Sequence, residues 1–252
     1  MENIEDIRIR PCTNSKYVQP FRVLYKQNGK ESLWDCVKMH DSLGILVYNK
    51  TRNAFVIVKQ FRPPVYMSKN RGMWKNSEVF PNSLSQKSSS SNPDTEPSSK
   101  KQKIDSTAGA PEKEGEASAA QTWGPSHEGC TYELCAGLVD KDLPLELIAK
   151  EEILEETGYD VPAESLEKIS WHHSSIGTAG TKMYLFYCEV TDEMLINSGG
   201  GNKTEGESIE VVYVPLEKSL ETVFDDALSK SSSLCFGFLW FDKYKRHLLN
   251  NT

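Results

Sequence analysis

Three glutamates beside one glycine constrain the fold of this chain more than any other feature. Glu152, Glu155 and Glu156 lie in the segment 145–158, whose apolar residues recur at helical spacing and which closes at Gly158. At about 100° per residue, the three carboxylates fall within roughly 100° on one face of a helix, and the opposite side is apolar. Like charges at these spacings destabilise a helix unless cations neutralise them, and Mg²⁺ is the usual partner of oxygen ligands. The segment therefore predicts a helix with one buried face and one metal-binding face.

The residues before this helix support the same interpretation. The segment 131–140 predicts a strand that runs into a glycine turn, which places backbone carbonyls beside the carboxylates. A bare Glu-x-x-Glu-Glu is more often a solvated acidic helix face. The combination of strand, glycine turn and acidic helix reverses that preference.

The constellation resembles the box of the Nudix hydrolases, Gly-x5-Glu-x7-Arg-Glu-U-x-Glu-Glu-x-Gly-U, where U is a bulky apolar residue. Gly137 takes the first glycine, and the segment 152–159 matches the second half. Leu143 stands in the place of the first glutamate and Glu151 in that of the arginine, which in the family orients a box carboxylate. We interpret the box as divergent and active.

Composition limits the classes of partner. A net charge of −7 supplies no positive field for nucleic acid, and no run approaches the ~18 apolar residues of a membrane span. The six cysteines lack metal-type spacing, and several lie in apolar runs, which favours reduced thiols. We expect a soluble cytoplasmic protein with neither nucleic-acid nor membrane partners.

The chain divides into three regions. Residues 1–40 predict an N-terminal β-element, and 41–252 predict the main domain, interrupted at about 67–128 by an insert rich in Ser, Lys, Glu and Pro. Such a composition cannot bury enough apolar surface to offset its ordering entropy, so we expect most of the insert to be disordered, with its two ends packed on the folded body.

The remaining patterns predict a mixed sheet between helices, the α/β/α sandwich (α/β, or α+β) of the Nudix family. By the same resemblance, the N-terminal element builds a homodimer. The expected strands are 21–26, 32–38, 43–48, 54–61, 166–173, 182–190 and 209–214, and the closing helices are 216–228 and 233–248.

Further candidate residues lie outside the box. Gln60 and Arg62 belong to a Gln-Phe-Arg-Pro motif like that of family members that cleave nucleoside-diphosphate sugars, and a planar guanidinium suits two diphosphate oxygens. Gly177 and Thr178 lie in a small-residue loop whose N–H groups could approach a diphosphate, although a plain turn explains the loop equally well.

A flexible glycine-rich loop, 199–210, precedes the last expected strand. In related enzymes such a loop carries a glutamate that assists the attacking water, and Glu207 is the first choice for that role here, with Glu205 second.

The resemblance also implies a reaction. It predicts Mg²⁺-dependent hydrolysis, with Mn²⁺ as a substitute, of the diphosphate of UDP-glucose to UMP and glucose 1-phosphate. The metal ligands would be Glu152, Glu155, Glu156 and the carbonyl of Ala136. Three alternatives stay open: a broad ADP-ribose or ADP-sugar pyrophosphatase, a degenerate module that binds nucleotide sugars without cleaving them, and a scaffold whose insert recruits partners.

Overall fold

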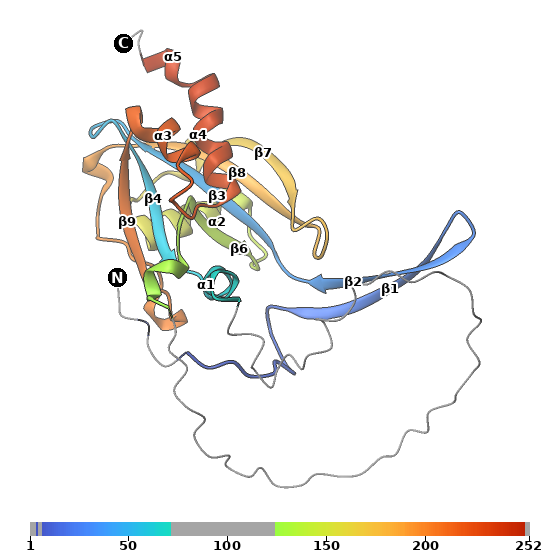
Figure 1. Ribbon diagram of the computed structural model, residues 1–252. Coiled ribbons are helices and arrows are strands. Elements are labelled where there is room, and N and C mark those ends of the chain that lie inside the picture. Colours follow the sequence, from blue (N-terminus) through green and yellow to red (C-terminus); the bar gives the residue numbers. More distant parts are fainter. Residues whose placement is uncertain (1–3, 5–6, 72–123, 250–252) are drawn as a thin grey trace, which may run out of the picture.

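A seven-stranded mixed sheet forms the centre of the protein, and a two-stranded hairpin projects from it (Figure 1). The computed structural model describes residues 4, 7–71 and 124–249. The strands are β1 Gln19–Gln27, β2 Lys30–Lys38, β3 Asp41–Asn49, β4 Ala54–Phe61, β5 Cys130–Glu133, β6 Cys135–Val139, β7 Glu167–Ser174, β8 Thr181–Val190 and β9 Ile209–Pro215. The helices are α1 Pro63–Lys69, α2 Leu145–Glu152, α3 Ser219–Phe224, α4 Ser232–Tyr244 and α5 Arg246–Leu249.

The sheet splits between its two central strands. Its order is β5-β4-β3-β8-β7, and in addition β6 pairs with β3 and β9 pairs with β4. Among these strand pairs, only β3–β8 is parallel. Strands β3 and β4 pair only at their hairpin ends. Beyond that point, β3 pairs with β6 and β4 pairs with β5.

The split corrects the prediction of one strand over 131–140. The segment forms two strands, separated at the fully buried Leu134. The strand breaks there because β5 pairs with β4, whereas β6 pairs with β3. Local sequence cannot distinguish this from one continuous strand, since both halves have strand-like composition.

Both faces of the sheet are covered, as predicted for an α/β/α sandwich. Side chains alternate along β3, so that Leu43, Ile45 and Val47 face α2, whereas Leu46 and Tyr48 face α4. The α2 side is completed by Ile148, Ala149, Ile153, Tyr159, Phe186 and Cys188, and the α4 side by Phe55, Ile57, Leu185, Leu234, Phe238 and Phe241.

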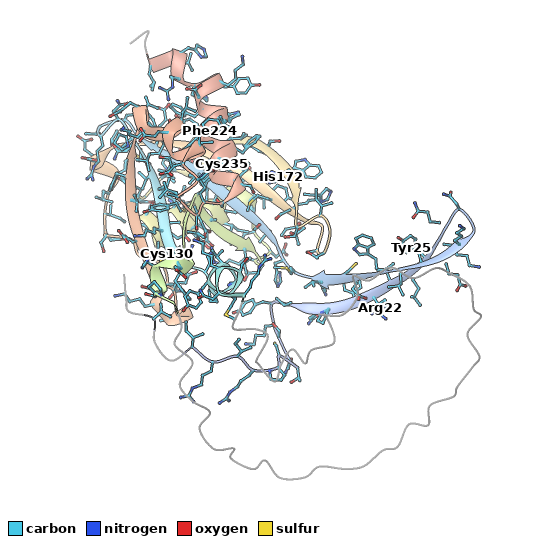
Figure 2. All side chains as sticks on the ribbon, viewed as in Figure 1. Arg22, Tyr25, Cys130, His172, Phe224 and Cys235 are labelled. Carbon is cyan, nitrogen blue, oxygen red and sulfur yellow. The ribbon has the colours of Figure 1, made fainter. Side chains whose placement is uncertain are left out.

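The N-terminal hairpin β1–β2 turns at Asn28 and Gly29, whose φ values of 53° and 80° are those of the predicted tight turn. Two hydrogen bonds tie it to the loop between β7 and β8: Trp34 Nε1 donates to Gly177 O at 2.8 Å, and Val37 N donates to Thr178 O at 2.9 Å. Its far end, with Tyr25, lies away from the body in Figure 2.

The ends of the predicted insert pack on the body. Helix α1 lies against a 3₁₀ turn at Ser126–Gly129; Tyr66 Oη donates to Gly124 O at 2.6 Å, and Asn70 Nδ2 donates to Glu128 Oε2 at 3.2 Å. Residues 72–123, on which the prediction of disorder falls, lie outside the described residues.

The closing helices are shorter than predicted. A 3₁₀ turn at Leu216–Lys218 precedes α3, which ends at Phe224, and α4 is separated from α5 at Lys245. Among the described helices, none combines the length and the apolar character needed to cross a membrane.

Candidate active site

The acidic helix forms as predicted and changes pitch where its glutamates lie. Helix α2 continues into one π turn, Ile153–Thr157, in which Thr157 Oγ1 donates to Ile153 O at 2.5 Å. Gly158 ends it with a φ of 82°, and a Cβ there would lie 2.1 Å from Asn197 O. The predicted glycine cap is therefore required both by backbone conformation and by packing.

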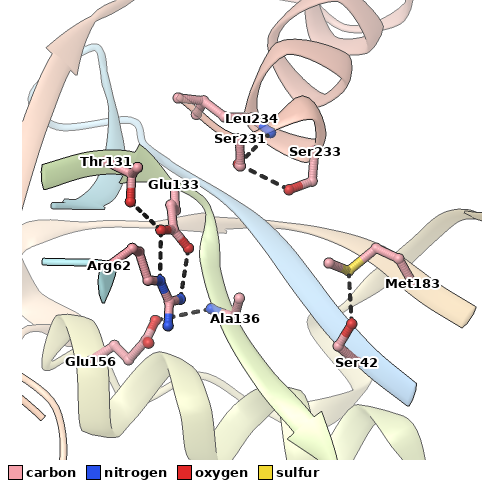
Figure 3. A network of polar contacts seen from close by, with 10 residues as sticks. All are labelled: Ser42, Arg62, Thr131, Glu133, Ala136, Glu156, Met183, Ser231, Ser233 and Leu234. Carbon is pink, nitrogen blue, oxygen red and sulfur yellow. Dashed lines mark hydrogen bonds and ion pairs between the residues drawn. The ribbon is translucent and has the colours of Figure 1, made fainter. Parts of the chain in front are cut away.

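Glu156 is the most enclosed carboxylate of the site. Its side chain is buried, and Oε2 accepts a hydrogen bond from Ala136 N at 2.9 Å, which joins the helix to β6 (Figure 3). Burial raises the pKa of Glu156 to about 8, and the negative charges of Glu152 and Glu207 add to the rise. The bond from Ala136 opposes part of this shift.

Glu152 lies against the next residue of the same strand. A Cβ added to Gly137 would lie 2.1 Å from both Cδ and Oε1 of Glu152, so only glycine leaves room for this carboxylate. Burial raises the pKa of Glu152 to about 7, helped by the negative charges of Glu155 and Glu207. Residues Ala136 and Gly137 thus collect the carboxylates of Glu156 and Glu152 at one place.

Arg62, at the end of β4, faces this place from the other side. Its Nε and Nη2 donate to Oε1 and Oε2 of Glu133 at 2.9 and 2.8 Å, and Thr131 Oγ1 also donates to Oε1 (Figure 3). The bonds to Glu133 raise the pKa of Arg62, and the charges of Glu133, Glu156 and Glu207 raise it further. Arg62 therefore brings a positive charge to a largely acidic site.

The glycine-rich loop that carries Glu207 is hydrogen-bonded at its base to the end of the acidic helix, and its flexibility stays a prediction. Gly200 N donates to Glu156 O at 2.9 Å and Gly201 N to Glu155 O at 3.0 Å. Glu207 Oε2 accepts from Asn202 N at 2.9 Å. The last carbonyls of the acidic helix thus accept hydrogen bonds from this loop. The loop places Glu207 close enough for its charge to raise the pKa values of Glu152 and Glu156.

In the part of the chain that the structure describes, the hydrogen bonds and strand pairs of the other predicted site residues involve none of Glu152, Glu156 and Arg62. Gln60 is buried in β4, between Thr131 of β5 and Ile209 of β9. The carbonyls of Gly177 and Thr178 accept bonds from the hairpin, and Thr178 N donates to Ser175 O at 2.9 Å. The side chain of Glu205 lies outside the described part of the chain. A substrate contact by any of them stays a prediction.

The two departures from the box pattern have separate surroundings. Glu151, in the arginine position, pairs with Lys141 at 2.5 Å, and both side chains are more than 40% exposed. The pair raises the pKa of Lys141, with further contributions from Glu155 and Glu152. Leu143 is 43% exposed. A cation therefore does stand beside the box, although it comes from the loop before the helix.

The oxygen donors of the site fit Mg²⁺. No three Asp, Glu, His or Cys side chains among residues 4, 7–71 and 124–249 are already grouped so that they could hold a metal ion. Mg²⁺ is commonly held by one or two carboxylates while it keeps several waters and takes substrate phosphates as ligands. Glu152 and Glu156, gathered at Ala136 and Gly137, match that requirement.

Sequence reasoning missed Glu133, the partner of Arg62. Its signal was a carboxylate in a strand among buried neighbours, because a charge in such surroundings needs an opposite charge or hydrogen-bond donors. It also missed Asn202 and Lys141, whose contacts depend on how the loops fold.

Comparisons with known proteins agree with this architecture. Uridine diphosphate glucose pyrophosphatase NUDT14 of Bos taurus is 36% identical over 242 residues, which cover 96% of this chain and 95% of that protein. The Mus musculus protein of the same name is 32% identical over the same shares. GDP-mannose pyrophosphatase of Enterobacter sp. (strain 638) is 38% identical over 96 residues, which are 38% of this chain and 48% of that protein. No family model matches the chain. The chain belongs to the Nudix hydrolase family, in its branch of nucleotide-sugar pyrophosphatases.

Proposed function

We propose that the protein hydrolyses the diphosphate of UDP-glucose, giving UMP and glucose 1-phosphate, and that the reaction depends on Mg²⁺. The observation that carries the proposal is the meeting of Glu152 and Glu156 at Ala136 and Gly137, opposite Arg62. Likeness to the uridine diphosphate glucose pyrophosphatases over 96% of the chain supports the choice of sugar nucleotide.

The metal site consists of Glu152, Glu156 and the Ala136 carbonyl, with Glu155 as the additional carboxylate at the exposed rim. Mg²⁺, when bound, neutralises charge that builds up on the phosphate oxygens and lowers the pKa of a coordinated water. Mn²⁺ has the same preference for oxygen ligands and is the expected substitute.

The side chains around this site divide the remaining tasks. Arg62 binds diphosphate oxygens through its free N–H groups. Glu207 accepts a proton from the attacking water and is held ready by its bond from Asn202 N. Because the loop is hydrogen-bonded to the carbonyls of Glu155 and Glu156, the position of Glu207 is set relative to the metal ligands.

Product analysis tests the proposal. The purified protein is incubated separately with UDP-glucose, GDP-mannose and ADP-ribose, each with Mg²⁺ and with a chelator. We expect UMP and glucose 1-phosphate to form fastest, and only with metal. Faster GMP or AMP release would assign another nucleotide sugar to the same site, and binding of UDP-glucose without cleavage would make the chain a degenerate binding module.

We also propose that the protein is a homodimer joined through its hairpin. One face of β1–β2 carries Phe21, Val23, Tyr25 and Trp34, which are 38–53% exposed, a large apolar surface for a monomer to leave in water. Sedimentation of the wild-type protein should give a dimer, and Phe21→Glu should give a monomer. Lys26→Glu, which changes an exposed charged side chain on the opposite face of β1, is the control. A monomeric wild type would refute the proposal.

We further propose a cytoplasmic location. All six cysteines lie in described segments, and none of them forms a disulfide there, as expected in a reducing compartment. Fractionation of cells that produce the protein, with a secreted marker and a cytoplasmic marker, tests this location.

A further inference from the structure

The carboxylate of Glu133 is held in three ways. It takes two bonds from Arg62 and one from Thr131, and its side chain is only 13% exposed. An exposed ion pair contributes little, but here the carboxylate is enclosed and the pair is bidentate, which gives it a defined geometry although Arg62 is 44% exposed. Glu133 can therefore fix the orientation of Arg62 as well as neutralise it.

The pairing leaves a definite part of Arg62 free. A guanidinium has five N–H donors, and Glu133 occupies those of Nε and one of Nη2. The remaining three, two on Nη1 and one on Nη2, form the end of the fork. That end is the part of Arg62 that can reach substrate without breaking its bonds to Glu133.

Other carboxylates lie near the same guanidinium. The charges of Glu156 and Glu207 both act on Arg62, and Figure 3 shows Arg62 between Glu133 and Glu156. Without Glu133, the enclosed Glu156 would be the next carboxylate for Arg62 to pair with. Glu156 would then be occupied by an arginine and poorly available to a metal ion.

We propose that Glu133 is a positioning residue with two effects: it turns the Nη1–Nη2 end of Arg62 toward the diphosphate, and it keeps Arg62 away from Glu156. The inference rests on the proposed function for its first effect. The second effect concerns only this chain and a divalent cation, so it can be measured without substrate.

A double-mutant cycle of Glu133→Gln and Arg62→Ala tests the proposal. Calorimetry measures Mn²⁺ affinity without substrate, and steady-state kinetics give KM and kcat for UDP-glucose. We expect Glu133→Gln to weaken Mn²⁺ binding and to raise KM, each by about tenfold, the lower end of what loss of such a supporting residue costs. In the Arg62→Ala background, Glu133→Gln should have no further effect on Mn²⁺ binding, because the competing guanidinium is gone.

Two variants serve as controls for general damage. Glu210→Gln removes a carboxylate that pairs with Lys59 at 3.3 Å on the neighbouring strand, and it should change neither quantity. Thr131→Val removes one bond to Glu133 but leaves its pair with Arg62, so its effect should be smaller than that of Glu133→Gln. Thermal unfolding of each variant shows whether it folds.

The outcomes separate the inference from the proposed function. Wild-type Mn²⁺ affinity in folded Glu133→Gln, or equal losses in the presence and absence of Arg62, would overturn the inference. A wild-type protein that binds Mn²⁺ but cleaves no nucleotide sugar would refute the proposed function, and the Mn²⁺ cycle would still decide the role of Glu133.

Discussion

Replacing Gly137 by alanine should slow catalysis strongly without unfolding the protein. The new Cβ would lie 2.1 Å from Cδ and Oε1 of Glu152, whereas ordinary contact begins at 3.4 Å, so the carboxylate must retreat by about 1.3 Å. The obstacle is the far end of a flexible side chain, which can move while the backbone of β6 stays in place. The strand should therefore keep its pairing with β3.

The displaced group is a proposed metal ligand. A misplacement of about 1 Å in an active site can cost about 100-fold in rate, equivalent to about 2.7 kcal/mol of transition-state stabilisation. We expect kcat/KM of Gly137→Ala to fall by about this factor and the Mg²⁺ concentration for half-maximal rate to rise. The melting temperature without metal should change by only a few degrees.

Gly237→Ala, in α4 on the other face of the sheet, is the matched control. An added Cβ at Gly237 would lie 3.5 Å or more from its nearest atoms, which is ordinary contact, and Gly237 does not have a positive φ. Both variants are assayed for UDP-glucose hydrolysis across a Mg²⁺ titration. Wild-type kcat/KM and Mg²⁺ dependence in Gly137→Ala would refute the assignment of Glu152 to the metal site.

Three other expectations follow from the same contacts. Between about pH 4.5 and 8, the folded metal-free protein retains a proton on Glu156 that the unfolded chain has lost. The melting temperature should therefore fall as pH rises through this range. A pH profile that Glu156→Gln does not flatten would contradict this expectation. Glu207→Gln should lower kcat by roughly 10²–10⁴-fold with Mn²⁺ affinity near wild type; unchanged kcat would remove it as the base. Asn49→Ala should cost about 3 kcal/mol in urea unfolding, because the buried amide donates to Tyr159 Oη and Asp192 Oδ1, both at 2.8 Å; a loss below ~1 kcal/mol would mean that the network is expendable.

Features set by local chemistry could be predicted from the sequence. The tight turn at Asn28 and Gly29, the glycine cap at Gly158 and the alternating strands formed as expected, because each depends on a few neighbouring residues. The acidic helix was equally clear, although its π turn was not, since Thr157 can bond to Ile153 O in several helical geometries.

Features set by contacts between distant segments could not be predicted. The break at Leu134 depends on two different neighbouring strands, and the pairing of Arg62 with Glu133 joins positions 71 apart in the chain. The anchoring of Glu207 likewise requires the helix end to meet the glycine run. In each case the residue types were visible, but the partner was supplied by tertiary structure.

The residues on either side of the segment 72–123 are linked to each other within the folded body. Tyr66 and Gly124 are already hydrogen-bonded, so the two points where this segment leaves and re-enters the fold are held together from within the body. Everything before it contributes β3 and β4, and everything after it contributes their partners β5, β6, β8 and β9. The protein is thus two polypeptide halves within one sheet: the first half supplies the central strands β3 and β4, and the second supplies the strands on both sides of them. Every strand pairing that builds the active site therefore joins residues outside 72–123.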